Sequence, residues 1–189
     1  MTDKILKIFI ILLLGSFEVC AEEVVLKFHT FQPMPANSNE KFVKPWSEKV
    51  YKDSNGEIRI EMYPAMQLGG RPPQLVEQVR DGVVDIIWTV AGYTPGRFPK
   101  LEVFDLPFLA STALATSQAA QEYAETVGAS DLEEYKVLAV HVHAPGTIHT
   151  KKTLIESVDD LKGLKIRGPS RVITRVLDKL GATPVGMPV

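Results

Sequence analysis

The stretch DLKGLKIRGPSRVITRVLDKLGATPVGMPV, residues 160–189, predicts a strand, a helix and a second strand in close succession. The expected strand over 164–166 ends at a Gly-Pro break, the helix covers 170–180, and the next strand covers 183–185. Such strand-to-helix turns are typical of α/β folds, which bind ligands where strands end and helices begin. This stretch therefore predicts an α/β fold and marks the region in which to look for a binding site.

Two arginines flank the expected start of that helix. Arg167 closes the strand, and Arg171 lies in the first turn of the helix. The dipole and free N–H groups of a helix N-terminus attract anions, and a guanidinium binds a carboxylate through two hydrogen bonds. A cation in a first turn opposes the dipole unless an anion or an acidic side chain compensates it. The pair indicates a carboxylate site, and a structural alternative pairs the arginines with Asp159 and Asp178.

The chain before this stretch alternates in the same way. Residues 24–31, 57–63 and 83–90 predict strands, and the last is apolar enough to be buried on both faces of a parallel sheet. Helices are expected after Asn37, acting as an N-cap, and over 74–81. The elements expected further along are a helix over 111–127, strands over 136–143 and 146–151, and a capped turn at Ser157 and Asp160. This order predicts α/β layering.

The first 21 residues have the pattern of a secretory signal peptide. Lys4 and Lys7 precede an apolar run over 8–14, which is short for a membrane span, and small residues favour cleavage after Ala21. An uncleaved membrane anchor is the alternative. Cleavage would remove Cys20, so the exported chain would contain no cysteine. We therefore expect a periplasmic protein without disulfides.

Composition and motifs argue against several classes of function. The 189 residues carry a formal net charge of −2, and this balance offers no basic excess for binding nucleic acid. The sequence contains no Gly-x-Ser-x-Gly elbow, no GxxxxGK[ST] phosphate-binding loop and no His-Glu-x-x-His. We therefore predict that the protein is not an enzyme and needs no cofactor.

Three histidines leave a second functional hypothesis open. His141 and His143 share a face of an expected strand, and His149 follows a short distance on. Clustered histidines bind zinc, which would suit an exported metal-dependent hydrolase. The simpler interpretation places them at polar, outward positions, because no carboxylate or cysteine accompanies them at ligand spacing.

The predicted elements divide into two lobes near residues 151–157. We expect residues 22–152 to form one lobe and residues 153–189 to begin a second. A single strand-helix-strand unit cannot bury its own faces, which favours a fragment of a longer protein. A truncated copy without function is the corresponding alternative.

Several motifs, taken in order, resemble those of a known family. FHTFQP, YPAMQLGG, RDGVVDIIWT, FDLPFL, DLKGLKIRGPSR and LGATPVGMPV follow one another along the chain. The chain thereby resembles the DctP-like periplasmic solute-binding proteins of TRAP transporters, and DLKGLKIR is the most specific of these motifs. The resemblance implies a periplasmic-binding-protein-like, type II-like fold, whose two α/β lobes close about a hinge on an organic anion. It also implies that the anion is delivered to a sodium-coupled membrane permease.

The resemblance implies roles for particular residues as well. Arg167 would contact the carboxylate of the ligand. The other residues implied to line the pocket are Pro169, Ser170 and Arg171 after the strand, and Trp88, Thr89 and Tyr93 after the DGxxD motif.

One position departs from the pattern of the family. Many members carry an arginine after Gly-Thr in the crossing strand, where this chain has Ile148. The departure weakens a sialic-acid or dicarboxylate assignment and leaves Arg171 as the candidate for a second charge. An aromatic or branched monocarboxylate, packed against Trp88 and Phe31, would suit this arrangement.

Overall fold

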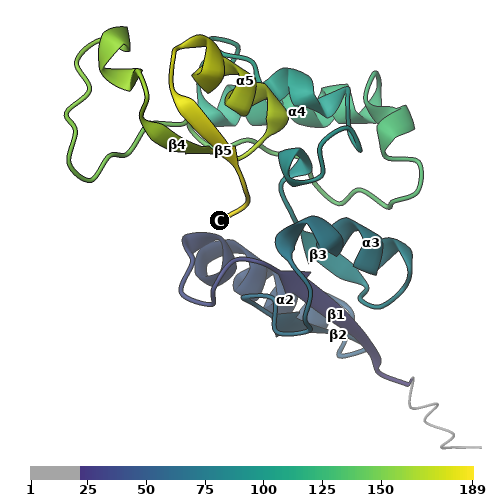
Figure 1. The fold of residues 1–189 in the computed structure, drawn as a ribbon. Helices are drawn as coiled ribbons and strands as arrows, with labels where there is room; N and C mark the ends of the chain where they lie inside the picture. The colour runs from purple at the N-terminus through teal and green to yellow at the C-terminus, as the bar shows by residue number, and fades with distance from the viewer. Residues whose placement is uncertain (1–21) are drawn as a thin grey trace, which may run out of the picture.

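A three-stranded parallel sheet forms the N-terminal part of the structure, a computed structural model that describes residues 22–189 (Figure 1). Its strands are β1 (Val24–Thr30), β2 (Ile58–Tyr63) and β3 (Ile86–Trp88). They are arranged in the order β2-β1-β3, so that Phe28 of β1 pairs with Met62 on one side and with Ile86 on the other. All three strands therefore end at the same edge of the sheet. The predicted signal peptide lies outside the described residues.

Two helices cover this sheet. A π-helical turn, Asn39–Val43, leads into α2 (Lys44–Asp53), which packs against β2. A 3₁₀ turn, Pro72–Gln74, leads into α3 (Leu75–Arg80), which packs against β3. One core cluster consists of Phe28 of β1, Ile60 of β2 and Val43 of the π-helical turn, all at most 9% exposed.

A second unit consists of the residues from which the fold was first predicted. β4 (Lys165–Gly168) and β5 (Thr183–Gly186) pair in parallel, and α5 (Arg171–Lys179) connects them. Leu161, Leu177 and Ala182 form a small separate core between helix and strands. The predicted strand, helix and strand are thus confirmed within two residues at each end. The predicted capping of the turn before β4 is confirmed too, because Ser157 and Asp160 form a capping box around the 3₁₀ turn Val158–Leu161.

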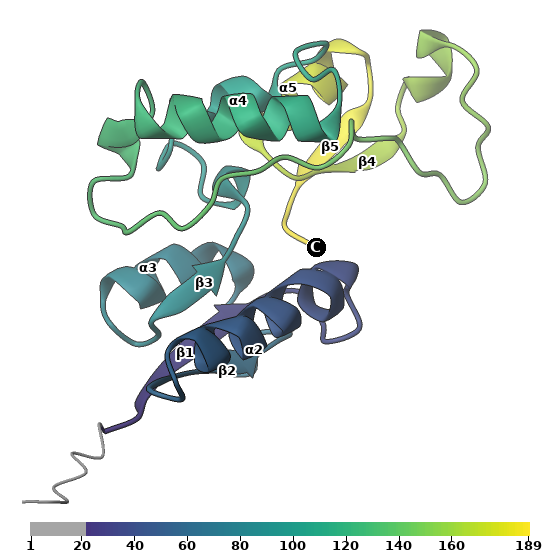
Figure 2. The same cartoon turned by 180° about the vertical axis from the view of Figure 1, so that it is seen from behind.

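The segment between the two units contains α4 (Ala113–Glu125) and three 3₁₀ turns, Ala91–Tyr93, Leu101–Asp105 and Ala129–Asp131. Figures 1 and 2 show the described chain arranged in two tiers. One tier contains the sheet of β1, β2 and β3 with α2 and α3, and the other contains α4, α5, β4 and β5. The predicted lobe boundary between residues 152 and 153 stays a prediction, and the position of α4 favours an earlier one.

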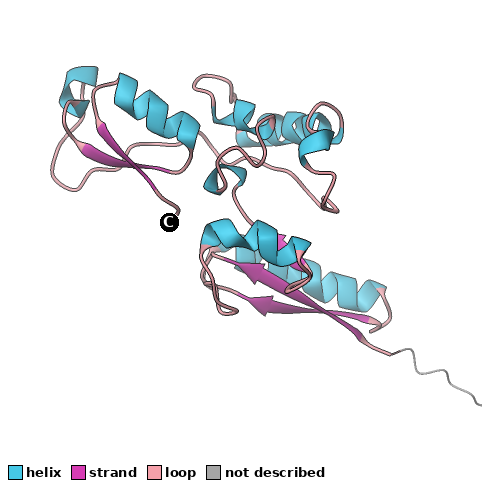
Figure 3. Ribbon diagram, turned by 45° about the vertical axis from the view of Figure 1, so that its right-hand side comes forward, coloured by secondary structure: helices cyan, strands magenta, loops and turns pink. Residues whose placement is uncertain are grey.

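Two predicted strands are wrong. Residues 136–143 and 146–151 form no strand, and Figure 3 shows them as loop. In the first segment, side chains of α4 accept hydrogen bonds from two backbone N–H groups: Val140 donates to Gln121 Oε1 at 2.6 Å and Val142 to Ser117 Oγ at 3.0 Å. Alternation of apolar residues was present, but a strand also needs a neighbouring strand with which to pair.

Other element boundaries were also misjudged. The apolar run over 83–90 is a strand only at Ile86–Trp88. Asn37 is not the N-cap of the first helix, because Asn37 and Ser38 are already helical and Ser38 makes no side-chain cap. Instead the buried Asn39 fixes this turn, with its Nδ2 donating to the backbone oxygen of Pro33 at 2.9 Å. Within residues 22–189, none of the helices combines the length and apolar character needed to cross a lipid bilayer.

Candidate functional site

Arg167 is an exposed cation at the C-terminal end of β4. Its Nε donates to the backbone oxygen of Met187 at 2.7 Å, and its Nη2 donates to Tyr93 Oη at 3.4 Å. Both partners are uncharged, and among residues 22–189 no acidic side chain forms an ion pair with this guanidinium. A guanidinium has five N–H donors, so several remain for an anion after these two contacts.

An aromatic pair adjoins this guanidinium. Tyr93, 7% exposed, ends the 3₁₀ turn after β3, and Phe31 follows β1. Their ring centroids lie 5.3 Å apart at an interplanar angle of 64°, the edge-to-face geometry that aromatic rings favour. Phe31 and Tyr93 come from the strand ends of one tier, and Arg167 comes from the other tier. The structure thus brings together three of the residues that sequence had suggested for ligand binding.

Trp88 lies in a different aromatic group. Its ring meets Phe42 at 5.9 Å and 89° and His141 at 5.0 Å and 86°. It also packs against the core of the first sheet, as an ordinary core tryptophan would. Thr89 follows it and is half-buried. The structure records no contact between this group and Arg167, so the ligand roles of Trp88 and Thr89 stay predictions.

Ser170 fixes the start of α5 against the other tier. It is 5% exposed, and its Oγ accepts a hydrogen bond from the N–H of Ile173 at 3.3 Å, which makes it the N-cap of the helix. A Cβ placed on Gly92 would lie only 2.6 Å from Ser170 Cβ. Only glycine leaves room for this approach, a requirement that sequence reasoning missed. Pro169, just before the cap, is half-buried.

Arg171 has an acidic partner that sequence reasoning did not find. Its Nε lies 2.6 Å from Glu102 Oε2, and the Glu102 side chain is only 11% exposed. The predicted alternatives were wrong about the partner: Asp159 forms an ion pair with Lys162, and no ion pair is recorded for Asp178 within the described chain. The cation in the first turn is compensated as electrostatics requires, from 69 residues earlier in the chain, where no local motif could reveal it.

Comparison with known proteins identifies the family. Residues 32–189 match the family described as bacterial extracellular solute-binding protein, family 7, also called DctP. The chain belongs to this family. The resemblance to DctP-like proteins of TRAP transporters is thereby confirmed, as is the predicted α/β fold class. Family 7 proteins are periplasmic solute-binding receptors, not enzymes.

Solved structures of family 7 proteins are closely similar. A TRAP solute-binding protein from a marine metagenome, described as specific for aromatic acid ligands, is 74% identical with a TM-score of 0.86; the match covers 88% of this chain and 52% of that one. A TRAP solute-binding protein of Rhodoferax ferrireducens, in complex with copurified benzoate, is 54% identical with the same TM-score and coverage.

A curated relative is the outer membrane transporter protein TsaT of Comamonas testosteroni, which is 31% identical over 148 residues, 77% of this chain and 43% of that protein. The chain spans about half the length of the family 7 relatives it matches.

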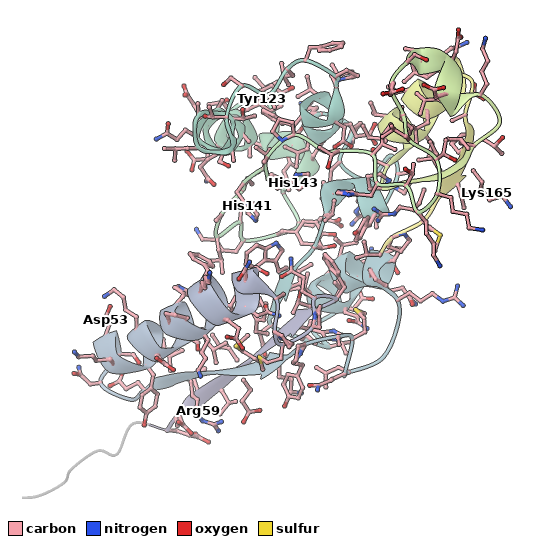
Figure 4. The ribbon with its side chains drawn as sticks, turned by 90° about the vertical axis from the view of Figure 1, so that its left-hand side faces the viewer. Asp53, Arg59, Tyr123, His141, His143 and Lys165 are labelled. Atoms are coloured by element: carbon pink, nitrogen blue, oxygen red, sulfur yellow. The ribbon has the colours of Figure 1, made fainter. Side chains whose placement is uncertain are left out.

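The three histidines are not brought together as a metal site. Figure 4 shows His141 and His143 on the loop between the tiers; His141 packs on Trp88, whereas the His143 ring contacts the backbone oxygen of Ala144. His149 Nε2 lies 2.9 Å from Thr147 Oγ1. No group of three or more histidine, cysteine or acidic side chains suited to a metal occurs within residues 22–189. The hydrolase hypothesis therefore lacks the cluster on which it depended.

Asp105 is a half-buried carboxyl close to the contact between Gly92 and Ser170. Burial raises its pKa, and the nearby charge of Glu102 adds to that effect, while a hydrogen bond with Ser170 and the proximity of His143 oppose it. The folded protein therefore holds this proton to a higher pH than the unfolded chain does. Native stability must fall as the pH rises through the interval between the two pKa values.

We expect Asp105→Asn to gain stability relative to the native protein as the pH rises from about 4 toward about 7, because the amide cannot ionise. Thermal denaturation of both proteins across this range measures the difference. Asp178→Asn, an exposed position on α5, is the matched control and should run parallel to the native curve. A constant offset between Asp105→Asn and the native protein at every pH would contradict the assignment.

Proposed function

We propose that the protein is the extracytoplasmic solute-binding subunit of a TRAP transporter. It captures a small organic acid in the periplasm and delivers it to the membrane permease subunits. Export depends on the signal peptide over residues 1–21, cleaved after Ala21. The sheet of β1 belongs to one lobe and the β4-α5-β5 unit to a second, and the two lobes close on the ligand by a hinge motion. Membership of family 7, described as bacterial extracellular solute-binding proteins, supports the capture of a solute outside the cytoplasm.

The observation that carries the proposal is the contact of Arg167 with Tyr93, whose ring packs against Phe31. The guanidinium supplies charge-assisted hydrogen bonds to a carboxylate, and the rings supply an apolar surface for the body of the ligand. These groups come from both tiers, so a ligand held by them would be enclosed when the tiers approach. Such a site binds an acid and leaves it chemically unchanged.

The ligand is an aromatic monocarboxylate in this proposal. The protein that is 74% identical has been crystallised with metahydroxyphenylacetate and with 3-hydroxybenzoate, and the one that is 54% identical with copurified benzoate. The aromatic pair beside Arg167 is consistent with ligands of this kind. We propose the following residues as the remaining lining of the site: Trp88, Thr89, Pro169, Ser170 and Arg171.

Benzoate and 3-hydroxybenzoate are expected to raise the midpoint of thermal unfolding, whereas benzamide, which has the same shape without the charge, is not. A ligand at about 100 times its dissociation constant stabilises the folded state by about 2.7 kcal/mol. The protein should carry residues 22–189 together with any residues that its gene encodes beyond Val189. Isothermal titration calorimetry then gives the affinities. Failure of every aromatic, aliphatic and dicarboxylic acid tested at millimolar concentration would refute the proposal.

A further inference from the structure

Glu102 uses both of its carboxylate oxygens inside the protein. Oε2 lies 2.6 Å from Arg171 Nε, and Oε1 accepts a hydrogen bond from the N–H of Gly96 at 3.1 Å. With only 11% of its side chain exposed, Glu102 is held between the loop at Gly96 and the first turn of α5. The positive charge of Arg171 is therefore compensated by a fixed, mostly buried anion.

A second carboxyl of the same 3₁₀ turn, Leu101–Asp105, faces the start of α5. Asp105 and Ser170, the N-cap of that helix, both approach Gly92: a Cβ placed on Gly92 would lie 3.3 Å from Asp105 Oδ2 and 2.6 Å from Ser170 Cβ. The anion-attracting end of α5 is thus already supplied with acidic groups by the protein itself. A further carboxylate brought there by a ligand would meet the like charge of Glu102.

Arg167 differs from Arg171 in this respect. Its recorded partners, Met187 O and Tyr93 Oη, carry no charge, and no acidic side chain pairs with it within the described residues. Among the described residues, the charge of Arg167 therefore has no acidic partner, whereas the charge of Arg171 is already paired with Glu102.

We propose that Glu102 is a specificity-determining residue: by neutralising Arg171 it limits the site to ligands with one carboxylate and disfavours dicarboxylates. The inference rests on the proposed function, because it concerns the same site. It assigns to Glu102 a role that needs no contact with the ligand. Removing the charge of Glu102 frees the Arg171 guanidinium, which then becomes a second anchor for a carboxylate.

The test compares benzoate with isophthalate, benzene-1,3-dicarboxylate, by calorimetry on the whole protein. The native protein is expected to bind benzoate at least about tenfold more tightly than isophthalate. Glu102→Gln keeps an acceptor for the Gly96 N–H but removes the charge, and it should shift the affinity ratio toward isophthalate by about tenfold. Glu48→Gln, an exposed position on α2, changes the net charge equally and should leave the ratio unaltered.

In the double variant Glu102→Gln, Arg171→Gln, the affinity ratio should no longer shift toward isophthalate. This result would show that the shift in Glu102→Gln requires Arg171. An unchanged ratio in Glu102→Gln, with benzoate still bound, would overturn the inference and leave the proposed function standing. Equal or tighter binding of isophthalate by the native protein would overturn it without the use of any variant. Failure of both acids to bind would instead count against the proposed function.

Discussion

Replacing Arg167 with alanine is expected to weaken binding of benzoate about 100-fold or more, corresponding to about 2.7 kcal/mol, without unfolding the protein. The side chain is exposed, and its contacts with Met187 and Tyr93 are single hydrogen bonds, so little stability depends on it. Its loss would nevertheless leave a ligand carboxylate without a charged partner as the site closes. Calorimetric titration measures the affinity, and circular dichroism checks that the fold is retained.

Two further variants make this measurement specific to Arg167. Arg175→Ala removes an exposed arginine of α5 for which no ion pair is recorded within residues 22–189, and its affinity should stay native. Arg167→Lys keeps the charge but loses the two-pronged geometry, and we expect a loss of about tenfold. An Arg167→Ala protein that binds benzoate as tightly as the native one would remove Arg167 from the site.

Replacing Gly92 with alanine is expected to lower the free energy of unfolding by about 1–3 kcal/mol, because the added methyl overfills a packed contact. The new Cβ would lie 2.6 Å from Ser170 Cβ and 3.3 Å from Asp105 Oδ2. Relief of this overlap requires the start of α5 to move away from the turn that carries Tyr93. Ligand affinity should fall along with stability, since Arg167 and Tyr93 would no longer be held together. Urea denaturation and calorimetry measure the two effects.

Gly146→Ala provides the control for that substitution. No atom lies within 4 Å of the Cβ that alanine would place there, and the backbone at this position does not have a positive φ. Its effect on stability should therefore stay within about 0.5 kcal/mol. Equal stability of the Gly92→Ala and Gly146→Ala proteins would show that the junction tolerates a methyl group, against the geometry described here.

Local patterns in the sequence predicted the second unit of the fold well. The strand, helix and strand around Arg167 and Arg171 depend on neighbouring residues: a Gly-Pro break, a serine cap and regular apolar spacing. The turn capped by Ser157 and Asp160 has the same local origin. These elements could be predicted because the residues that form each of them are neighbours in the sequence.

Most of the errors and omissions involve partners that are distant in the chain. The alternation over 136–143 was correctly observed, but side chains of α4 took the place of a pairing strand. Glu102 is paired with Arg171, and Gly92 is packed on Ser170. Both pairs are so far apart in the sequence that no local residue pattern predicts them. The histidines, which the sequence presented as a group, have different partners: His141 packs on Trp88, and the other two contact residues near them in the chain.

The central position of β1 determines the order in which the first sheet can assemble. β1 is the first described strand of the chain, yet its two edges are paired by β2 and β3, which end only at Tyr63 and Trp88. A newly made chain therefore carries a strand with both edges open until β2 has emerged, and with one edge open until residues 86–88 have emerged; open edges invite pairing with other chains. Parallel pairing across such separations is slow compared with local folding. A chain in transit is thus most exposed to aggregation during synthesis of its first 88 residues, and a chaperone that holds β1 over that interval would protect it most effectively.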